Sequence, residues 1–207
     1  APPLRDIRFA FDEVCDLPSL LKLDDFDHVE TDMVFAVLDE VGRFAAEVIA
    51  PTNVDGDQIG ARWIAASETD DGWAAVSTPE SFRNAYAKLV DSGFNAIPFE
   101  PDFGGGGFPW LVALAVQEMF TSSNMALSLC PLLTQGAIDA ILAHGSDEQK
   151  ATYLPKMMTG EWTGTMNLTE PQAGSDVGAV TTKAESNGDG SWSITGQKIY
   201  ITFGEHD

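Results

Sequence analysis

The sequence contains little cysteine and little positive charge. Its two cysteines, Cys15 and Cys130, lie far apart and belong to no CxxC pattern, which argues against a disulfide-rich scaffold and indicates reduced thiols. Lys and Arg number 11 against 32 Asp and Glu, so the formal net charge is −21. Such a surface repels nucleic acid and anionic membranes, and neither is expected as a partner.

Long apolar runs and metal-binding patterns are also missing. No uninterrupted run of 18 apolar residues occurs, and the first residues do not read as a signal peptide, so we expect a cytoplasmic protein without a membrane span. His28, His144 and His206 form no ligand spacing, and no HExxH or EF-hand pattern occurs. We therefore expect no metal site.

The apolar content of 44% is enough for a folded core. After a lead-in extension at residues 1–30 with one short helix, apolar residues recur with the helical period of 3.6 up to about residue 160. Residues 52–78 interrupt this pattern and are predicted to be an extended connection with a β-excursion between residues 61 and 76. The predicted helices cover residues 31–50, 79–91 (with Thr78 as N-cap and Gly93 as its end), 109–122, 124–144, and 147–153 (ended by Pro155).

The composition then changes to one rich in Thr, Gly and Val. Short strands are predicted at 163–169, 180–185, 191–194 and 198–202, with a hairpin turn at 186–190. We therefore predict an α+β protein. An N-terminal all-α helical bundle domain at 1–160 precedes the beginning of an antiparallel β-barrel-like domain at 161–207, which is incomplete at Asp207.

The predicted strands carry the residues best suited to binding a ligand. The hydroxyls of Thr169 and Thr202 can hydrogen-bond ring heteroatoms, and successive N–H groups around Gly174 and Ser175 can form a concavity for an anion. Tyr200 can cover the face of an aromatic ring. These features suit a flat, partly anionic cofactor, but an ordinary hairpin whose glycines serve only its turns stays open as an alternative.

Two carboxylates in the same stretch, Glu170 and Asp176, invite an acid–base interpretation. We favour a structural role instead, in which each carboxylate holds the loop by accepting hydrogen bonds from backbone N–H groups.

Four short segments together resemble the flavin-binding block of the acyl-CoA dehydrogenase family, in the family's order and spacing. They are Leu168–Pro171, Ala173–Asp176, Ile194–Lys198 and Tyr200–Thr202. The resemblance implies an FAD cofactor and an all-α domain before a β-domain.

In that family the residues that match Met166 to Ser175, Gly174 among them, contact FAD. The backbone of Met166 and Leu168 and the hydroxyl of Thr169 meet the isoalloxazine ring, and Ser175 lies at the FAD pyrophosphate and at the acyl-CoA substrate.

The resemblance also implies that Tyr200, Ile201 and Thr202 pack on the flavin. The family often has an aromatic residue in place of Met166 and commonly Trp in place of Tyr200. Both changes keep a bulky apolar contact.

The implied function is the α,β-dehydrogenation of an acyl-CoA thioester in fatty acid metabolism, with an electron-transfer flavoprotein as acceptor and a homo-oligomeric (dimeric or tetrameric) enzyme. The family's catalytic glutamate lies in a C-terminal helical domain, beyond Asp207, so we name no catalytic base here. We expect the chain to be the front part of a longer protein and inactive alone.

Within the family, the 3-methylmercaptopropionyl-CoA dehydrogenase group is the most similar. The segments that carry this similarity are Ala1–Phe9, the stretch from Asn124 through Lys150, and Gly204–Asp207. Two alternatives remain: an acyl-CoA oxidase or nitroalkane-type flavoprotein oxidase on the same scaffold, and a non-catalytic helical module that assembles with other chains.

Overall fold

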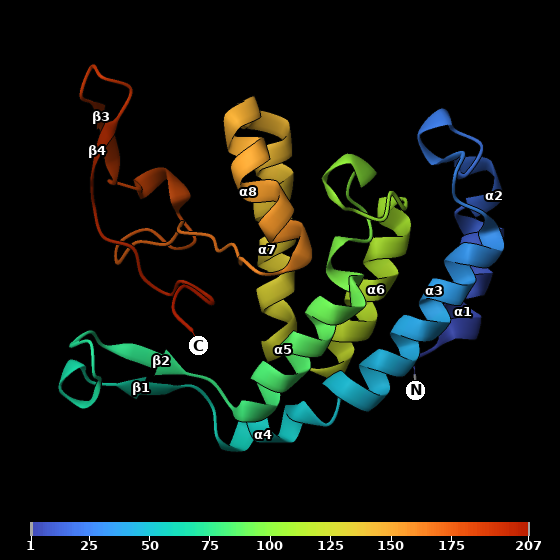
Figure 1. Cartoon of the computed structure of the whole chain (residues 1–207), viewed down its shortest axis with the longest axis horizontal. Coiled ribbons are helices and arrows are strands. Elements are labelled where there is room, and N and C mark those ends of the chain that lie inside the picture. Colours follow the sequence, from blue (N-terminus) through green and yellow to red (C-terminus); the bar gives the residue numbers. More distant parts are fainter. Residues whose placement is uncertain (1, 207) are drawn as a thin grey trace. The chain divides into compact units, whose positions relative to one another are not determined.

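The computed structural model describes residues 2–206, which form two compact units (Figure 1). The helical unit runs up to Gly164 and includes Glu205 and His206, and the strand unit is Thr165–Gly204. The α+β fold class is confirmed: helices dominate the first unit, and an antiparallel strand pair lies in the second.

The helical unit contains eight α-helices in its described residues, joined by short turns and one hairpin. The α-helices are α1 Leu4–Phe9, α2 Leu17–Leu20, α3 Thr31–Phe44, α4 Thr52–Gln58, α5 Glu80–Ser92, α6 Trp110–Ser123, α7 Met125–His144 and α8 Asp147–Thr159. Two π-helical segments, Ala10–Val14 and Ala45–Ile49, extend α1 and α3, and 3₁₀ turns lie at Asp24–Phe26, Ala66–Glu68, Phe94–Ala96 and Pro101–Phe103.

Helix α3 is amphipathic as predicted, and its extension ends at Ile49. The prediction of an extended connection from residue 52 was wrong for its first part, which forms α4. Thr52 explains this difference: its buried hydroxyl donates to Ile49 O and accepts from the Asn124 side chain, so the chain turns into a new helix. The predicted β-excursion is present as a hairpin of β1 Arg62–Ile64 and β2 Ala75–Ser77.

Helix ends follow the expected residues in some places and not in others. Gly93 ends α5 with a φ of 71°, as predicted, but the N-cap of α5 is Pro79 rather than Thr78. The capping box of α8 is confirmed by reciprocal bonds between Ser146 and Gln149. Pro155 does not end α8, which continues to Thr159 with Gly160 as its C-cap. Leu154, Met157 and Met158 are buried on one side of α8, and this burial outweighs the backbone bond that proline removes.

The bundle core lies where α3 packs on α6, α6 on α7, and α7 on α8 (Figure 1). Both α6 and α7 are apolar around most of their circumference, as expected for helices with neighbours on several sides. Cys130 of α7 is buried in the interior of the helical unit, and this burial raises the pKa of its thiol to about 12. Cys15 is exposed, and neither cysteine forms a disulfide. Side chains with at most 1% exposure include Leu17, Val34, Leu38, Val41, Val112, Ile138 and Leu154.

The strand unit is built differently. Its hairpin pairs β3 Lys183–Ser186 with β4 Trp192–Thr195, in a register that sets Lys183 against Thr195. Every residue of both strands is exposed. Gly188 and Gly190 take the positive φ values, 81° and 91°, that the turn between the strands requires.

Two of the four predicted strands were wrong. Residues 163–169 and 198–202 form no ladder in the described residues, where the bond from Ile199 N to Thr169 O is the one backbone–backbone bond between the two segments. Tyr200 and Phe203 have φ values of 56° and 51°, which do not fit a continuous strand. Thr-rich composition favours a strand, but a strand also needs a partner to receive its hydrogen bonds.

Candidate functional site

The predicted cofactor residues all lie in the strand unit, on three separate segments. Met166, Leu168 and Thr169 are on the extended segment before Glu170, and Gly174 and Ser175 are on the loop that follows. Tyr200, Ile201 and Thr202 are on the last segment of the unit.

The first and last of these segments lie side by side. Ile199 N donates to Thr169 O at 3.0 Å, and the Thr165 hydroxyl donates to Thr202 O at 2.6 Å. Lys198 adds a side-chain bond from Nζ to Leu168 O at 3.0 Å. These three bonds bring the predicted residues Leu168, Thr169 and Thr202 into one neighbourhood.

The apolar members of this set face outward. The exposed fractions are 61% for Met166, 44% for Leu168 and 87% for Tyr200. Single exposed apolar side chains are normal on protein surfaces. Here several occur within one small unit and beside hydroxyl groups, which is the mixture that a flat heteroaromatic ligand can cover.

The loop with Gly174 and Ser175 offers free backbone donors. Among the described residues, neither of these two backbone N–H groups donates to another protein group. A Cβ added at Gly174 would meet only the Thr169 methyl, at 3.9 Å. The space beside Gly174 is therefore open, and the donor set is of the kind that holds a phosphate oxygen.

Glu170 is the best-anchored side chain of the unit. Its carboxylate is 1% exposed and accepts hydrogen bonds from Thr181 N (2.8 Å) and Oγ1 (2.9 Å), and from Thr182 N (2.9 Å). It also accepts from Gln172 Nε2 (2.6 Å) and Lys198 Nζ (2.9 Å). Hydrogen bonds from Thr182, Thr181 and Lys198 hold the pKa of Glu170 well below its ordinary range.

The structural interpretation of the two carboxylates is therefore confirmed. Glu170 accepts from the backbone of Thr181 and Thr182, and Asp176 Oδ1 accepts from Gly178 N at 3.1 Å. A carboxylate so fully occupied as Glu170, with so low a pKa, is unsuited to taking a proton near neutral pH.

Sequence reasoning missed Lys198, Gln172 and Thr181 as parts of this cluster. One signal was available for the lysine, because Lys183 and Lys198 are the two basic residues between residues 165 and 204. A carboxylate predicted to be buried needs donors, preferably a cation.

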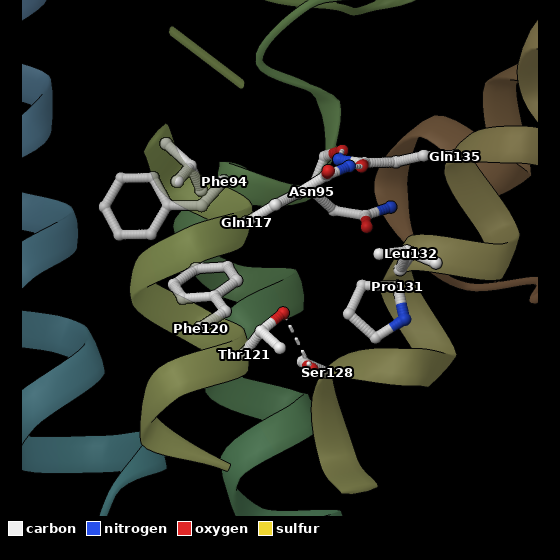
Figure 2. A pocket seen from close by; sticks show the side chains of 10 residues that line it. Phe94, Asn95, Gln117, Phe120, Thr121, Ser128, Pro131, Leu132 and Gln135 are labelled. Atoms are coloured by element: carbon white, nitrogen blue, oxygen red, sulfur yellow. Dashed lines mark hydrogen bonds between the residues drawn. The ribbon is translucent and has the colours of Figure 1, made fainter. Parts of the chain in front are cut away.

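The helical unit contains its own small cavity, of about 10 Å³, between α6 and α7 (Figure 2). A chain of amides crosses one wall: Gln117 Nε2 donates to Gln135 Oε1 at 2.5 Å, and Gln135 Nε2 donates to Asn95 O at 2.9 Å. Asn95 is 3% exposed, and its Oδ1 has no hydrogen-bond partner in the described residues. The volume matches about one water molecule.

Two further expectations concern membranes and metals. One helix of the described chain, α7, is long and apolar enough to cross a membrane by length and composition, although Thr134, Gln135 and Asp139 interrupt its apolar residues. Core helices of globular proteins meet the same criterion, and α7 packs on α6 and α8. No group of three or more His, Cys, Asp or Glu that could hold a metal ion occurs between residues 2 and 206.

Comparison with known proteins gives a consistent result. Residues 31–161 match the family model described as "Acyl-CoA dehydrogenase, N-terminal domain". The chain is 46% identical over 99% of its length to 3-methylmercaptopropionyl-CoA dehydrogenase of Ruegeria pomeroyi, covering 34% of that protein. It is 37% identical over 99% of its length to a butyryl-CoA dehydrogenase of Syntrophomonas wolfei, covering 33% of it.

A solved structure agrees. The complex of glutaryl-coenzyme A dehydrogenase with glutaryl-CoA is 27% identical, with a TM-score of 0.68 over 84% of this chain and 40% of that one. The chain spans about a third of the length of the curated relatives it matches. With a family model over more than half of its residues, the chain belongs to the acyl-CoA dehydrogenase family.

Proposed function

We propose that the protein containing this chain is an FAD-dependent acyl-CoA dehydrogenase that oxidises the α,β-bond of an acyl-CoA thioester. The observation that carries the proposal is the 46% identity to 3-methylmercaptopropionyl-CoA dehydrogenase, which extends over 99% of the chain. The same relative makes 3-methylmercaptopropionyl-CoA the substrate that we propose, and a methylthio-acryloyl-CoA the product.

The residues of the strand unit fit FAD. Thr169 offers a hydroxyl beside the exposed apolar surface of Met166 and Leu168, and the backbone donors of Gly174 and Ser175 border open space. We propose that the first group binds the isoalloxazine ring and the second a phosphate oxygen, with Ser175 also at the acyl-CoA. Tyr200, Ile201 and Thr202 are proposed to pack on the ring.

When bound, FAD would supply the acceptor for the hydride that leaves the β-carbon. The protein must also remove the α-proton and polarise the thioester carbonyl with hydrogen-bond donors. Glu170 is unsuited to the first task, because its oxygens already accept five hydrogen bonds. We therefore assign the catalytic base to a glutamate beyond Asp207, as the family resemblance implies.

The remaining assignments belong to the same proposal. Residues 1–160 are assigned to a helical domain with a lead-in extension at 1–30, and 161–207 to the start of a β-domain. An electron-transfer flavoprotein is proposed as the electron acceptor, a dimer or tetramer as the assembly, and the cytoplasm as the location.

The test uses the purified complete gene product. We expect a visible flavin spectrum and reduction of an artificial electron acceptor that depends on 3-methylmercaptopropionyl-CoA, with butyryl-CoA as a poorer substrate. Equal rates with both would reject the substrate proposal but not the reaction. Fast transfer of electrons to oxygen would favour an acyl-CoA or nitroalkane-type oxidase, and a colourless protein would favour a non-catalytic helical module.

A further inference from the structure

The carboxylate of Glu170 is the centre of the strand unit but has no role in the proposed reaction. A buried carboxylate is destabilising unless donors compensate it. Here Thr181, Thr182, Gln172 and Lys198 supply five hydrogen bonds of 2.6–2.9 Å. These four residues therefore converge on one side chain.

The donors flank the residues that are predicted to contact the cofactor. Gln172 on one side and Thr181 with Thr182 on the other bracket the loop that contains Gly174 and Ser175. The Nζ of Lys198 bonds both Glu170 and Leu168 O. Lys198 also lies two residues before Tyr200.

We propose that Glu170 and Lys198 are positioning residues for FAD, which hold these three segments in one arrangement before the cofactor arrives. The inference rests on the proposed function, because it concerns FAD. Its physical basis is preorganisation: a site already fixed in its bound form does not lose binding free energy to ordering its loops.

Glu170→Gln in the complete gene product tests the proposal. Glutamine keeps the size of the side chain, but its NH₂ group cannot accept a hydrogen bond, and Lys198 loses its counter-charge. We expect the FAD dissociation constant of the apoprotein to rise by about tenfold or more. Amide hydrogen exchange at Thr181 and Thr182 should accelerate, while exchange in β3 and β4 stays unchanged.

Glu185→Gln is the matched control, with the same change of charge in the same unit. Glu185 is 70% exposed and pairs with Lys183 at 2.9 Å on the surface of the hairpin. The FAD dissociation constant of the Glu185→Gln variant should equal that of the parent protein within about twofold, because exposed ion pairs contribute little to stability.

Lys198→Met separates positioning from a general loss of structure. It removes the bonds of Lys198 to Leu168 O and to Glu170 but leaves the backbone donors of Thr181 and Thr182 on Glu170. We expect a protein that still binds FAD, with the visible absorption band of the bound flavin displaced from that of the parent, because Leu168 is proposed to contact the ring.

The outcomes are distinct. FAD affinity in Glu170→Gln equal to that of the parent overturns the proposal. A parent protein that binds no FAD overturns the proposed function and the inference with it. If exchange in Glu170→Gln accelerates in β3 and β4 as well, Thr181→Val decides. It removes the hydroxyl's bond to Glu170 and the bond that the hydroxyl accepts from Gln172, but keeps the backbone donor of residue 181 on Glu170. Unchanged FAD affinity would then reject positioning, and a two- to fivefold loss, about 0.4–1 kcal/mol, would support it.

Discussion

The two units achieve order by opposite means. In the helical unit, apolar side chains such as Leu38 and Ile138 are at most 1% exposed, and they form the core between the helices. In the strand unit, Trp192 and Ile194 are 61% and 74% exposed, and the buried side chains of its described residues are the small Ala173 and the charged Glu170. The comparison teaches that the helical unit depends on apolar burial, whereas the strand unit depends on hydrogen bonds to one carboxylate.

The largest effect should come from removing apolar volume in the helical unit. Leu38→Ala should lower the free energy of unfolding by about 2–5 kcal/mol, because it deletes a buried side chain and leaves a cavity. Urea unfolding followed by circular dichroism measures the change. A loss below about 1 kcal/mol would mean that the core around α3 is looser than its burial indicates.

Asn124→Ala should have the next largest effect. It should lower the free energy of unfolding by about 2 kcal/mol, because two hydrogen bonds are lost. The side chain accepts from Leu127 N as the N-cap of α7 and donates to Thr52 Oγ1 at 2.8 Å. The matched variant Asn187→Ala removes two exposed hydrogen bonds in the strand-unit turn. In the same urea measurement, Asn187→Ala should lower the free energy of unfolding by less than half as much as Asn124→Ala. Equal losses would contradict the prediction that the buried bonds of Asn124 contribute more.

Tyr86→Phe should lower the free energy of unfolding by about 1 kcal/mol, the typical net contribution of one hydrogen bond. The partly buried hydroxyl of Tyr86 donates to Gly160 O at 2.9 Å, across 74 residues of sequence. Burial, with a smaller contribution from Cys130, raises the pKa of Tyr86, so this phenol stays protonated in ordinary buffers. Thermal unfolding at pH 7 would show the loss, and an unchanged midpoint would mean that water replaces the bond.

Acid should loosen the strand unit at its carboxylate. The pKa of Glu170 is lower in the folded chain than the value of about 4.3 for an unfolded glutamate. Its contribution to stability is therefore fully present above about pH 4.3 and is lost as the pH falls towards the folded value. Exchange at the amides of Thr181 and Thr182, corrected for intrinsic rates, should be constant from about pH 7 to 5 and accelerate below 4. Glu170→Gln should abolish that dependence.

The smallest effect should come from an apolar side chain of the strand unit. Ile194→Thr changes a residue that is 74% exposed, and surface substitutions usually stay within about 0.5 kcal/mol. The difference between the losses of unfolding free energy in Ile194→Thr and Leu38→Ala measures how far the two units differ in their dependence on apolar burial. A loss above 1 kcal/mol in urea unfolding would show that β4 is covered in solution and that its apolar face contributes to stability.

The helices could be predicted well because their apolar period is local and strong. The periods around Val34, Leu38 and Val41, and the cap at Ser146, give α3 and the start of α8. Proline was given too much weight at Pro155, since the burial of Leu154 and Met157 could not be weighed without the neighbouring helices. Helix α4 was missed because its cause, the bond from Asn124 to Thr52, spans 72 residues.

The candidate site could be predicted as a stretch of sequence but not as an arrangement. Residue chemistry indicated Thr169, Gly174, Ser175, Tyr200 and Thr202, and the family resemblance added Met166, Leu168 and Ile201. The pairing of Glu170 with Lys198 across 28 residues carries no local signature. The same holds for the strands: composition at 198–202 favours extension, but the φ of Tyr200 shows that the local conformation differs.

The bond between Asn124 and Thr52 also bears on the order in which the helical unit assembles. The cap contact of Asn124 closes a loop of three residues, whereas its contact with Thr52 closes one of 72, and closing the longer loop costs more chain entropy. The cap can therefore form as α7 nucleates, and Thr52 can join once α4 docks. In stopped-flow kinetics, Asn124→Ala should slow folding, while Thr52→Ala should mainly speed unfolding.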